Sequence, residues 1–229
     1  MTKDTTLSET VENHLKAIYY LSQEDEGASN QRIAARLGIT GAGVTKMLHT
    51  LAKHRLATHT PYQRVHLTPL GEKVALELIR HHRLIELYLM ETLGYGWEHV
   101  HAEAERLEHH ISEEFEESIE RILGFPEFDP HGDPIPSRDG IMPHFAKQTL
   151  ASHPDGAEVV VRRVTDEDPE LLRYLGERNL RPGTQARIVA HEPFGGSIVV
   201  CIVDKDERIS PEAARNVFVE LIDDPAATD

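Results

Sequence analysis

The chain has 229 residues, of which 39% are hydrophobic and 28% are charged, and this composition excludes a disordered chain. Its single cysteine, Cys201, excludes an internal disulfide framework and a cysteine-based zinc cluster. Lys and Arg number 24 and Asp and Glu 39, so the net charge of −15 argues at first sight against nucleic acid as a partner. No apolar run approaches the roughly 20 residues that span a bilayer, so we expect a cytoplasmic protein with no membrane partner.

The first predicted elements lie before residue 68. Apolar residues at positions 7, 11, 15, 18 and 21 have the spacing of an amphipathic helix. A short helix over residues 30–38 ends at Gly38, a tight turn follows, and a second helix covers residues 42–55. Residues 56–67 then predict a β-hairpin whose tip carries Pro61 and Gln63.

Two longer helices are expected next, over residues 70–92 and from position 97 or 98 to residue 123. The short break between them favours an antiparallel pair. Residues 124–155 are rich in Pro, Gly and Asp and predict an ordered loop or linker. Strand-like runs then cover residues 158–164, 185–189, 197–203 and 216–221, with a helix between the first two, and indicate a small barrel.

Charge is segregated along the chain. From residue 29 to residue 80 there are eight Lys or Arg against two acids, a balance of 8 − 2 = +6. From residue 97 to residue 133 there are two Arg against twelve acids, a balance of 2 − 12 = −10. Such a chain can present a basic face to a polyanion and an acidic site to cations, although charged faces are also often only solvated.

The basic segment has the pattern of a winged helix-turn-helix, in which the second helix enters the major groove of DNA. Its first residues would meet the bases, and polar residues of the first helix and the wing would grip the backbone. The predicted DNA-binding residues are Asn30, Arg32, Thr40, Ala42, Gly43, Thr45, Lys46, Gln63 and Arg64. A structural or protein-binding module is the alternative, and the charge of +6 favours DNA.

The acidic segment contains possible metal ligands at helical spacing. His101, Glu105, Glu108 and His109 share one stripe of a helix, and His82 and Glu86 share a face of the preceding helix. If the helices pair, these side chains converge, and clustered carboxylates repel one another unless a cation neutralises them. Imidazole and carboxylate without thiolate suit Mn²⁺ or Fe²⁺, and Zn²⁺ also binds such ligands. The alternative is an acidic helix that is only solvated.

These motifs together resemble the diphtheria toxin repressor family of metal-dependent transcription regulators, in its manganese-sensing branch. The resemblance covers nearly the whole chain and rests on LKAIYYL, RIAARLGITGAGVTKML, LTPLGEKVA, HHRLIELYL, VHAEAERLEHHIS and DPHGDPIP. It implies a mainly α fold with a small β domain. The expected parts are a winged helix-turn-helix domain (1–73), a helical metal-binding and dimerisation domain (74–140), a linker (141–156) and an SH3-like barrel (157–223).

The resemblance also implies two neighbouring metal sites. By position, Glu105, Glu108 and His109 match the primary, activating site. The residues that match the second site are His82, Glu86 and His101, with Glu167 and Glu170 as the ligands from the barrel. Iron-sensing relatives have Cys at the position of Glu105 and manganese-sensing ones have Glu, and a hard carboxylate favours Mn²⁺.

The chain departs from the family pattern on its first helix. The N-terminal ligand, Met in iron sensors and Asp in manganese sensors, falls on Asn13, so either Asn13 or Glu12 would serve. Another carboxylate ligand of short manganese sensors falls on Lys16, which cannot bind a metal while protonated.

The resemblance therefore implies a homodimeric, Mn²⁺-dependent regulator that binds double-stranded DNA at a palindromic operator and represses metal-uptake genes. An ion that bridges the first helix and the dimer helix would fix the spacing of the two recognition helices. The alternatives are an Fe²⁺-responsive regulator of the same family and, in a different class, a helical di-metal carboxylate enzyme. A winged-helix regulator that answers a small organic ligand is a further alternative.

Overall fold

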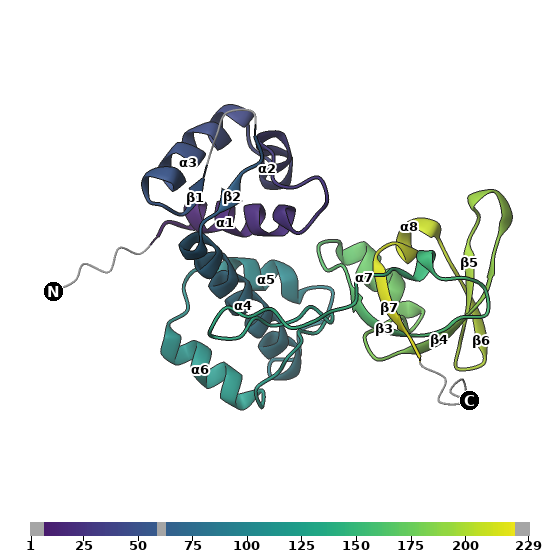
Figure 1. Cartoon of the computed structure of the whole chain (residues 1–229). Helices are drawn as coiled ribbons and strands as arrows, with labels where there is room; N and C mark the ends of the chain where they lie inside the picture. The colour runs from purple at the N-terminus through teal and green to yellow at the C-terminus, as the bar shows by residue number, and fades with distance from the viewer. Residues whose placement is uncertain (1–6, 59–62, 223–229) are drawn as a thin grey trace, which may run out of the picture. The chain divides into compact units, whose positions relative to one another are not determined.

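The computed structural model describes residues 7–58 and 63–222, which form two compact units (Figure 1). The first unit contains the chain as far as His81, together with Glu108–Ile111 and Pro136–Ile141. The second contains His82–Leu107, Ser112–Ile135 and the chain from Met142 onward. Helix α4 (Pro69–Glu91) contributes its first part to one unit and its last part to the other. Among the described residues, no helix has both the length and the apolar character that a membrane span requires.

The first unit is a helix-turn-helix with a short hairpin. Its elements are α1 (Glu9–Ser22), α2 (Asn30–Leu37), α3 (Gly41–Lys53), β1 (Ala57–Thr58) and β2 (His66–Leu67). The hairpin strands are antiparallel, with Ala57 opposite Leu67. The apolar stripes of the three helices meet in a core that fully buries Leu15, Ile33 and Leu48. The predicted helices and hairpin are confirmed, whereas Pro61 at the predicted tip lies outside the described residues.

Local capping fixes where the two helices of the motif begin and end. The Ser29 hydroxyl accepts the amide of Arg32 at the start of α2, and the Thr40 hydroxyl accepts the amide of Gly43 at the start of α3. Gly38 ends α2 in the left-handed region, with φ of 64°, which glycine adopts without a steric penalty. Gly38 and Thr40 therefore encode the turn between the helices, and Ser29 encodes the start of α2.

The second predicted long helix is wrong as a single element. The chain forms α5 (Val100–Leu107) and α6 (Glu113–Ile122), separated by residues 108–112. Ser112 caps the start of α6, since its hydroxyl accepts the amide of Phe115. The acids that follow Ser112 lie in the first turn, where the helix dipole favours negative charge. His101 and Glu105 therefore lie on α5, whereas Glu108 and His109 follow its end.

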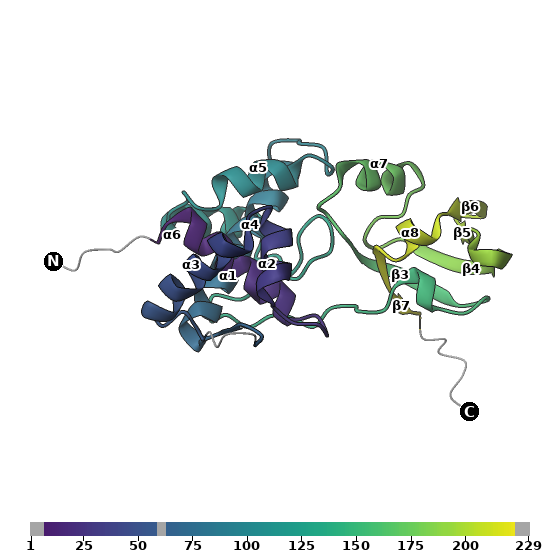
Figure 2. The same cartoon turned by 90° about the horizontal axis from the view of Figure 1, so that it is seen from above.

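The C-terminal part of the second unit is a five-stranded antiparallel sheet in the order β6-β5-β4-β3-β7. The strands are β3 (Glu158–Val164), β4 (Gln185–His191), β5 (Ile198–Ile202), β6 (Lys205–Ile209) and β7 (Val217–Leu221). The shorter helical elements are η1 (Leu150–Ser152), α7 (Pro169–Glu177), η2 (Pro193–Gly195) and α8 (Pro211–Ala214). Leu172 and Leu175 of α7 join the core of the sheet, and Figure 2 shows α7 alongside it. The predicted small β domain is confirmed.

The sequence prediction missed β6, because its residues, KDERI, are almost all charged. β6 lies at one edge of the sheet, where charged side chains are common because they discourage pairing with another chain. Val203 and Asp204 form the turn before it, with φ of 47° and 62°.

Candidate metal centre and DNA-binding surface

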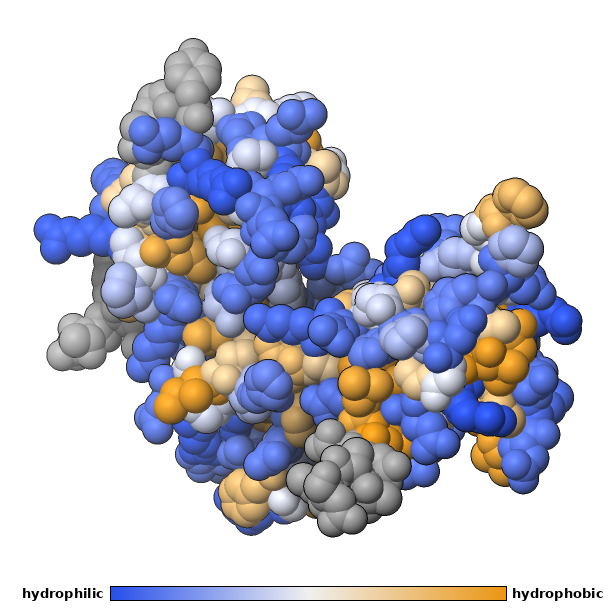
Figure 3. Space-filling model, turned by 45° about the vertical axis from the view of Figure 1, so that its right-hand side comes forward, coloured by the Kyte–Doolittle hydropathy of each residue, from blue (hydrophilic) through white to orange (hydrophobic). Residues whose placement is uncertain are grey.

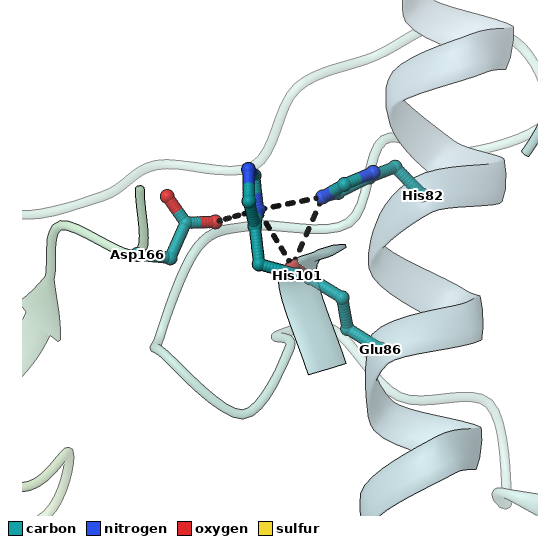
Figure 4. A group of neighbouring side chains, drawn as sticks. All are labelled: His82, Glu86, His101 and Asp166. Atoms are coloured by element: carbon teal, nitrogen blue, oxygen red, sulfur yellow. Dashed lines mark hydrogen bonds and ion pairs between the residues drawn. The ribbon is translucent and has the colours of Figure 1, made fainter. Parts of the chain in front are cut away.

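Four nitrogen and oxygen donors gather in the second unit (Figure 4). His82 and Glu86 lie one turn apart on α4, His101 comes from α5, and Asp166 comes from the segment between β3 and α7. Oε1 of Glu86 lies 2.9 Å from Nε2 of His82 and 3.1 Å from Nδ1 of His101. Nδ1 of His101 lies 3.2 Å from Oδ2 of Asp166. We call these four residues the Glu86 cluster.

The charges of the Glu86 cluster depend on one another. Burial by itself would raise the pKa of Glu86, but the charge of His82 and hydrogen bonds from both histidines lower it to about 2. Burial would likewise lower the pKa of His101, but the hydrogen bond and charge of Asp166, together with Glu86, raise it to about 10. Burial would raise the pKa of Asp166, but the hydrogen bond and charge of His101, together with the charges of His131 and His82, lower it. At neutral pH a protonated imidazole therefore lies between two ionised carboxylates.

The other oxygen of Glu86 faces a second group of buried donors. Its Oε2 lies 4.0 Å from Nδ1 of His131, and Asp129 completes the group. Nε2 of His131 donates to the carbonyl of Trp97 at 2.8 Å, so in the neutral imidazole Nδ1 carries the lone pair. Within the described part of the chain, Oε2 of Glu86, Nδ1 of His131 and Oδ2 of Asp129 have no hydrogen-bond partner.

The loop that carries Asp129 and His131 has a fixed shape. Oδ1 of Asp129 accepts the amides of His131 and Asp133 at 2.8 and 2.9 Å, and the amide of Val164 donates to the carbonyl of His131 at 2.9 Å. Gly132 has φ of 85°, and a Cβ there would lie 1.9 Å from the carbonyl oxygen of Arg162. Only glycine fits this approach to β3, which places His131 beside the segment of Asp166.

These donors fit a divalent metal ion. Imidazole nitrogens and carboxylate oxygens without thiolate suit Mn²⁺, Fe²⁺ or Zn²⁺. The three buried atoms without hydrogen-bond partners also fit, although Oδ2 of Asp129 lies 3.8 Å from Nε of Arg83, since buried polar atoms are normally satisfied by a hydrogen bond or by coordination to a metal. Burial, together with the charges of Asp133 and Glu86, raises the pKa of Asp129 well above its usual value, so without an added cation this carboxyl tends to hold its proton.

A separate group of charged residues lies in the first unit, on α1 and on residues 108–109. Nδ1 of His109 lies 2.6 Å from Oε2 of Glu12, and its Nε2 lies 3.6 Å from Oε1 of Glu108. The ammonium group of Lys16 lies 2.9 and 2.8 Å from the two carboxylate oxygens of Glu108, whose side chain is 1% exposed. We call these four residues the Glu108 cluster.

The structure divides the predicted metal ligands between these two clusters. His82, Glu86 and His101 are brought together as expected, but the carboxylate from the β domain is Asp166. Glu167 and Glu170 are exposed and are not among the donors that the described residues gather there. At the N-terminal position, Glu12 is the residue that contacts His109, and Asn13 is half-buried beside it. Glu105 is exposed on α5, within the second unit, whereas Glu108 and His109 belong to the first.

Sequence reasoning missed Asp166, Asp129 and His131. Asp166 directly precedes the predicted Glu167. Both residues lie in a coil segment, whose sequence has no periodicity that indicates which carboxylate faces the histidines. Asp129 and His131 lie in DPHGDPIP, a segment that predicts a loop and contributes to the family resemblance but was assigned no metal ligand. The signal was a histidine between two Asp in a segment fixed by Gly and Pro.

The recognition helix presents an open surface. Thr40, Ala42, Gly43 and Lys46 are exposed at the start of α3, and Thr45 is half-buried. The amide nitrogen of the Asn30 side chain donates to the Thr45 hydroxyl at 2.9 Å. Asn30 therefore holds α2 against α3, in addition to any contact with a partner.

The predicted backbone contacts have different surroundings. Gln63 and Arg64 on the wing are exposed. Arg32 forms ion pairs with Glu24 and Glu26, and its guanidinium donates to the carbonyl of Gly27 at 2.9 Å. Contact between Arg32 and a phosphate would therefore compete with two carboxylates.

Family models match three consecutive parts of the chain. Residues 6–65 match the family "Iron dependent repressor, N-terminal DNA binding domain", residues 68–137 its metal binding and dimerisation domain, and residues 148–221 the FeoA domain. The chain is 31% identical to the iron-dependent repressor IdeR of Mycobacterium leprae, with 94% of this chain and 99% of that protein covered.

Solved structures match along nearly the whole chain as well. One is a manganese-dependent transcriptional repressor in complex with manganese, at 34% identity and a TM-score of 0.87, with 93% of this chain and all of that chain (100%) covered. Another is ScaR with bound Zn²⁺, at 31% identity and a TM-score of 0.78, with coverage of 93% and 99%. The chain therefore belongs to the family of iron-dependent and diphtheria toxin repressors, metal-dependent DNA-binding transcription regulators, and is not an enzyme.

Proposed function

We propose that this protein is a homodimeric, Mn²⁺-responsive repressor that binds a palindromic operator. The observation that carries the proposal is the Glu86 cluster, in which four donors from three separate segments converge on a buried carboxylate. The unpartnered Oε2 of Glu86, facing His131 and Asp129, supports it. We propose that the Glu86 cluster forms one metal site, which Asp129 and His131 extend. The residues proposed for the second metal site are Glu12, Asn13, Glu105, Glu108 and His109.

Two features of the donors favour Mn²⁺ over a softer ion. Carboxylates make up half of the Glu86 cluster, and Mn²⁺ accepts oxygen donors readily. The lone thiol, Cys201, lies on β5 and belongs to neither cluster. Fe²⁺ remains the alternative, because it accepts the same mixture of imidazole and carboxylate.

The residues of the chain act in this proposal by joining segments. A bound divalent ion supplies the positive charge that lets several buried carboxylates stay ionised together. Glu86 and His82 contribute from α4, His101 from α5, and Asp166 from the segment before α7. Joint coordination of one ion links these segments and, in this proposal, favours the arrangement that binds DNA. The metal ion therefore tightens DNA binding, and DNA tightens metal binding by the same factor.

For DNA, α3 would enter the major groove, with Thr40, Ala42, Gly43, Thr45 and Lys46 near the bases. Gln63 and Arg64 on the wing, with Asn30 and Arg32 on α2, would contact the backbone. A twofold dimer carries two such surfaces and therefore fits an inverted repeat.

The second unit offers an apolar surface for dimerisation. Phe115 and Ile122 of α6, and Phe125 just after it, are 46%, 63% and 67% exposed. Figure 3 shows hydrophobic patches among hydrophilic side chains on the face of the molecule that it draws. Exposed aromatic and aliphatic groups of this size mark protein interfaces. The Ile122→Glu variant should shift the protein toward monomer in light scattering, while an unchanged dimer would place the interface elsewhere.

The test begins with selection of binding sites from random-sequence duplex DNA in the presence of Mn²⁺, because the operator is unidentified. We expect selected sequences to be inverted repeats. Binding is then measured with Mn²⁺, with Fe²⁺ under anaerobic conditions, with Zn²⁺ and with a chelator. The proposal predicts the tightest binding with Mn²⁺ and little with the chelator. Equal affinity in the chelator would exclude metal control, and a preference for Fe²⁺ would replace the assigned ion.

A further inference from the structure

The Glu108 cluster already contains a positive charge. Lys16 lies on α1, one turn after Glu12, and its side chain is 9% exposed. Its ammonium group lies within 2.9 Å of both oxygens of Glu108. This bidentate contact engages both of the oxygens that Glu108 could offer to a metal ion.

His109 is held in the orientation of a metal ligand. Oε2 of Glu12 lies 2.6 Å from Nδ1, so we assign the proton of the neutral imidazole to Nδ1, which donates to Glu12. Nε2 then carries the lone pair, and it faces Oε1 of Glu108 at 3.6 Å. A carboxylate that orients a histidine through its other nitrogen is the usual arrangement around metal sites. In this geometry Glu12 positions His109, and Nε2 and Glu108 are the donors.

Glu108 needs a cation in this position. Its side chain is buried, and an isolated buried carboxylate is strongly destabilising. Lys16 supplies that charge from within the chain. A protonated amine cannot coordinate a metal, so Lys16 and a metal ion cannot both use the same carboxylate oxygens.

We propose that Lys16 is a built-in cation that competes with the divalent metal for Glu108. The inference rests on the proposed function, because it takes the Glu108 cluster as the second metal site. A metal ion binds there only after the ammonium group has moved off the carboxylate. The Glu108 cluster is consequently the weaker site, and the Glu86 cluster fills first as the Mn²⁺ concentration rises.

The first experiment measures Mn²⁺ binding to the full chain by calorimetry and by the EPR signal of free Mn²⁺. Lys16→Met keeps the aliphatic stem and removes the charge, whereas Lys16→Arg keeps the charge. We expect Lys16→Met to tighten binding of the second Mn²⁺ by about tenfold or more, because two like charges within a few ångströms repel strongly in a buried site. Lys16→Arg should stay close to the wild type. Equal affinity in Lys16→Met and the wild type would overturn the inference.

The second experiment needs no metal and uses the Tm of the chelator-treated protein. Lys16→Met leaves Glu108 buried without this cation, so its Tm should fall below that of the wild type. Adding Glu108→Gln to Lys16→Met should restore most of the loss, because the pair is then neutral. If Lys16→Met has the Tm of the wild type, or if the double variant is no better, Lys16 does not neutralise Glu108 and the inference is wrong.

A third variant separates this inference from the proposed function. In Glu86→Gln, which weakens the other site, Lys16→Met should restore binding of one Mn²⁺ per chain. If wild-type protein binds no Mn²⁺, the proposed function itself fails. If it binds Mn²⁺ but none of the affinities depends on Lys16, only the present inference fails.

Discussion

The two clusters contain similar donors, but different positively charged groups accompany their buried carboxylates. Each holds at least one glutamate that is almost fully buried and a histidine that contacts it. In the Glu86 cluster a protonated His101, which can lose its proton, offsets part of the charge of the two carboxylates. In the Glu108 cluster the ammonium group of Lys16 contacts and offsets the carboxylate of Glu108. A set of donors alone therefore does not define a metal site. The affinity for a metal ion also depends on the positive charge that the ion must displace from the carboxylates.

The largest effect is expected from Glu86→Gln. Glu86 has one oxygen in each group of donors, so the variant removes the charge that both groups share. We expect Mn²⁺ affinity at this site to fall by about a thousandfold, and Mn²⁺-dependent DNA binding to be lost with it.

Calorimetry with Mn²⁺ checks this expectation, and Glu91→Gln, an exposed acid at the end of the same helix, is the control. The control should bind Mn²⁺ like the wild type. If Glu86→Gln keeps full affinity, the two clusters do not differ in the way proposed, and the Glu108 cluster would be the principal site.

Asp166→Asn should have the next largest effect. Asp166 supplies the second carboxylate of the cluster, and we expect its loss to weaken Mn²⁺ binding by about a hundredfold. Glu170→Gln is the matched control, since Glu170 is exposed four residues further along the chain. A larger loss of Mn²⁺ affinity for Glu170→Gln than for Asp166→Asn would instead support Glu170 as the ligand from the β domain and remove Asp166 from the site.

The sequence was sufficient for most of the elements and for three of the four residues of the Glu86 cluster. His82 and Glu86 are one helical turn apart, and this spacing places them on one face wherever the helix packs. His101 could be predicted as a third donor, because its helix was expected to pair with the helix of His82 and Glu86. The β domain could be predicted from its apolar strands, although the charged strand β6 could not.

The rest depended on tertiary contacts that no periodicity encodes. The choice between Asp166 and Glu167 depends on how the chain leaves β3, and the role of His131 depends on the carbonyl of Trp97. The break between α5 and α6 did leave a local signal, because Ser112 followed by acids is a helix start. The acids also continue the helical pattern, so periodicity alone predicts one unbroken helix. The contact of Lys16 with Glu108 joins residues 92 positions apart, which sequence spacing does not predict.

The two clusters should also differ in their response to pH. His101, with a pKa raised to about 10, is protonated in the metal-free protein at pH 6–8 and must lose its proton to bind a metal. Glu86 is already ionised in that range, because its pKa is lowered to about 2. Binding therefore releases one proton from His101, and Mn²⁺ affinity should rise by about tenfold per pH unit.

Calorimetry in buffers of different ionisation enthalpy measures this proton directly. His101→Gln has no imidazole to deprotonate, so its weaker binding should lose most of the pH dependence between pH 6 and 8. If the wild type binds Mn²⁺ with the same affinity at both pH values, His101 is not a ligand in the bound state, and the contrast with the Glu108 cluster disappears.

The smallest effect is expected from Glu12→Gln, which tests the roles within the Glu108 cluster. If Glu12 orients His109 without binding the metal, a glutamine oxygen can still accept the proton of Nδ1, although more weakly. We therefore expect the second Mn²⁺ to bind more weakly by at most about tenfold, with the first unaffected. Glu108→Gln, which removes a donor, should abolish the second binding event. Equal losses in the two variants would make Glu12 a ligand, and the cluster would then offer two carboxylates, of which Lys16 neutralises only one.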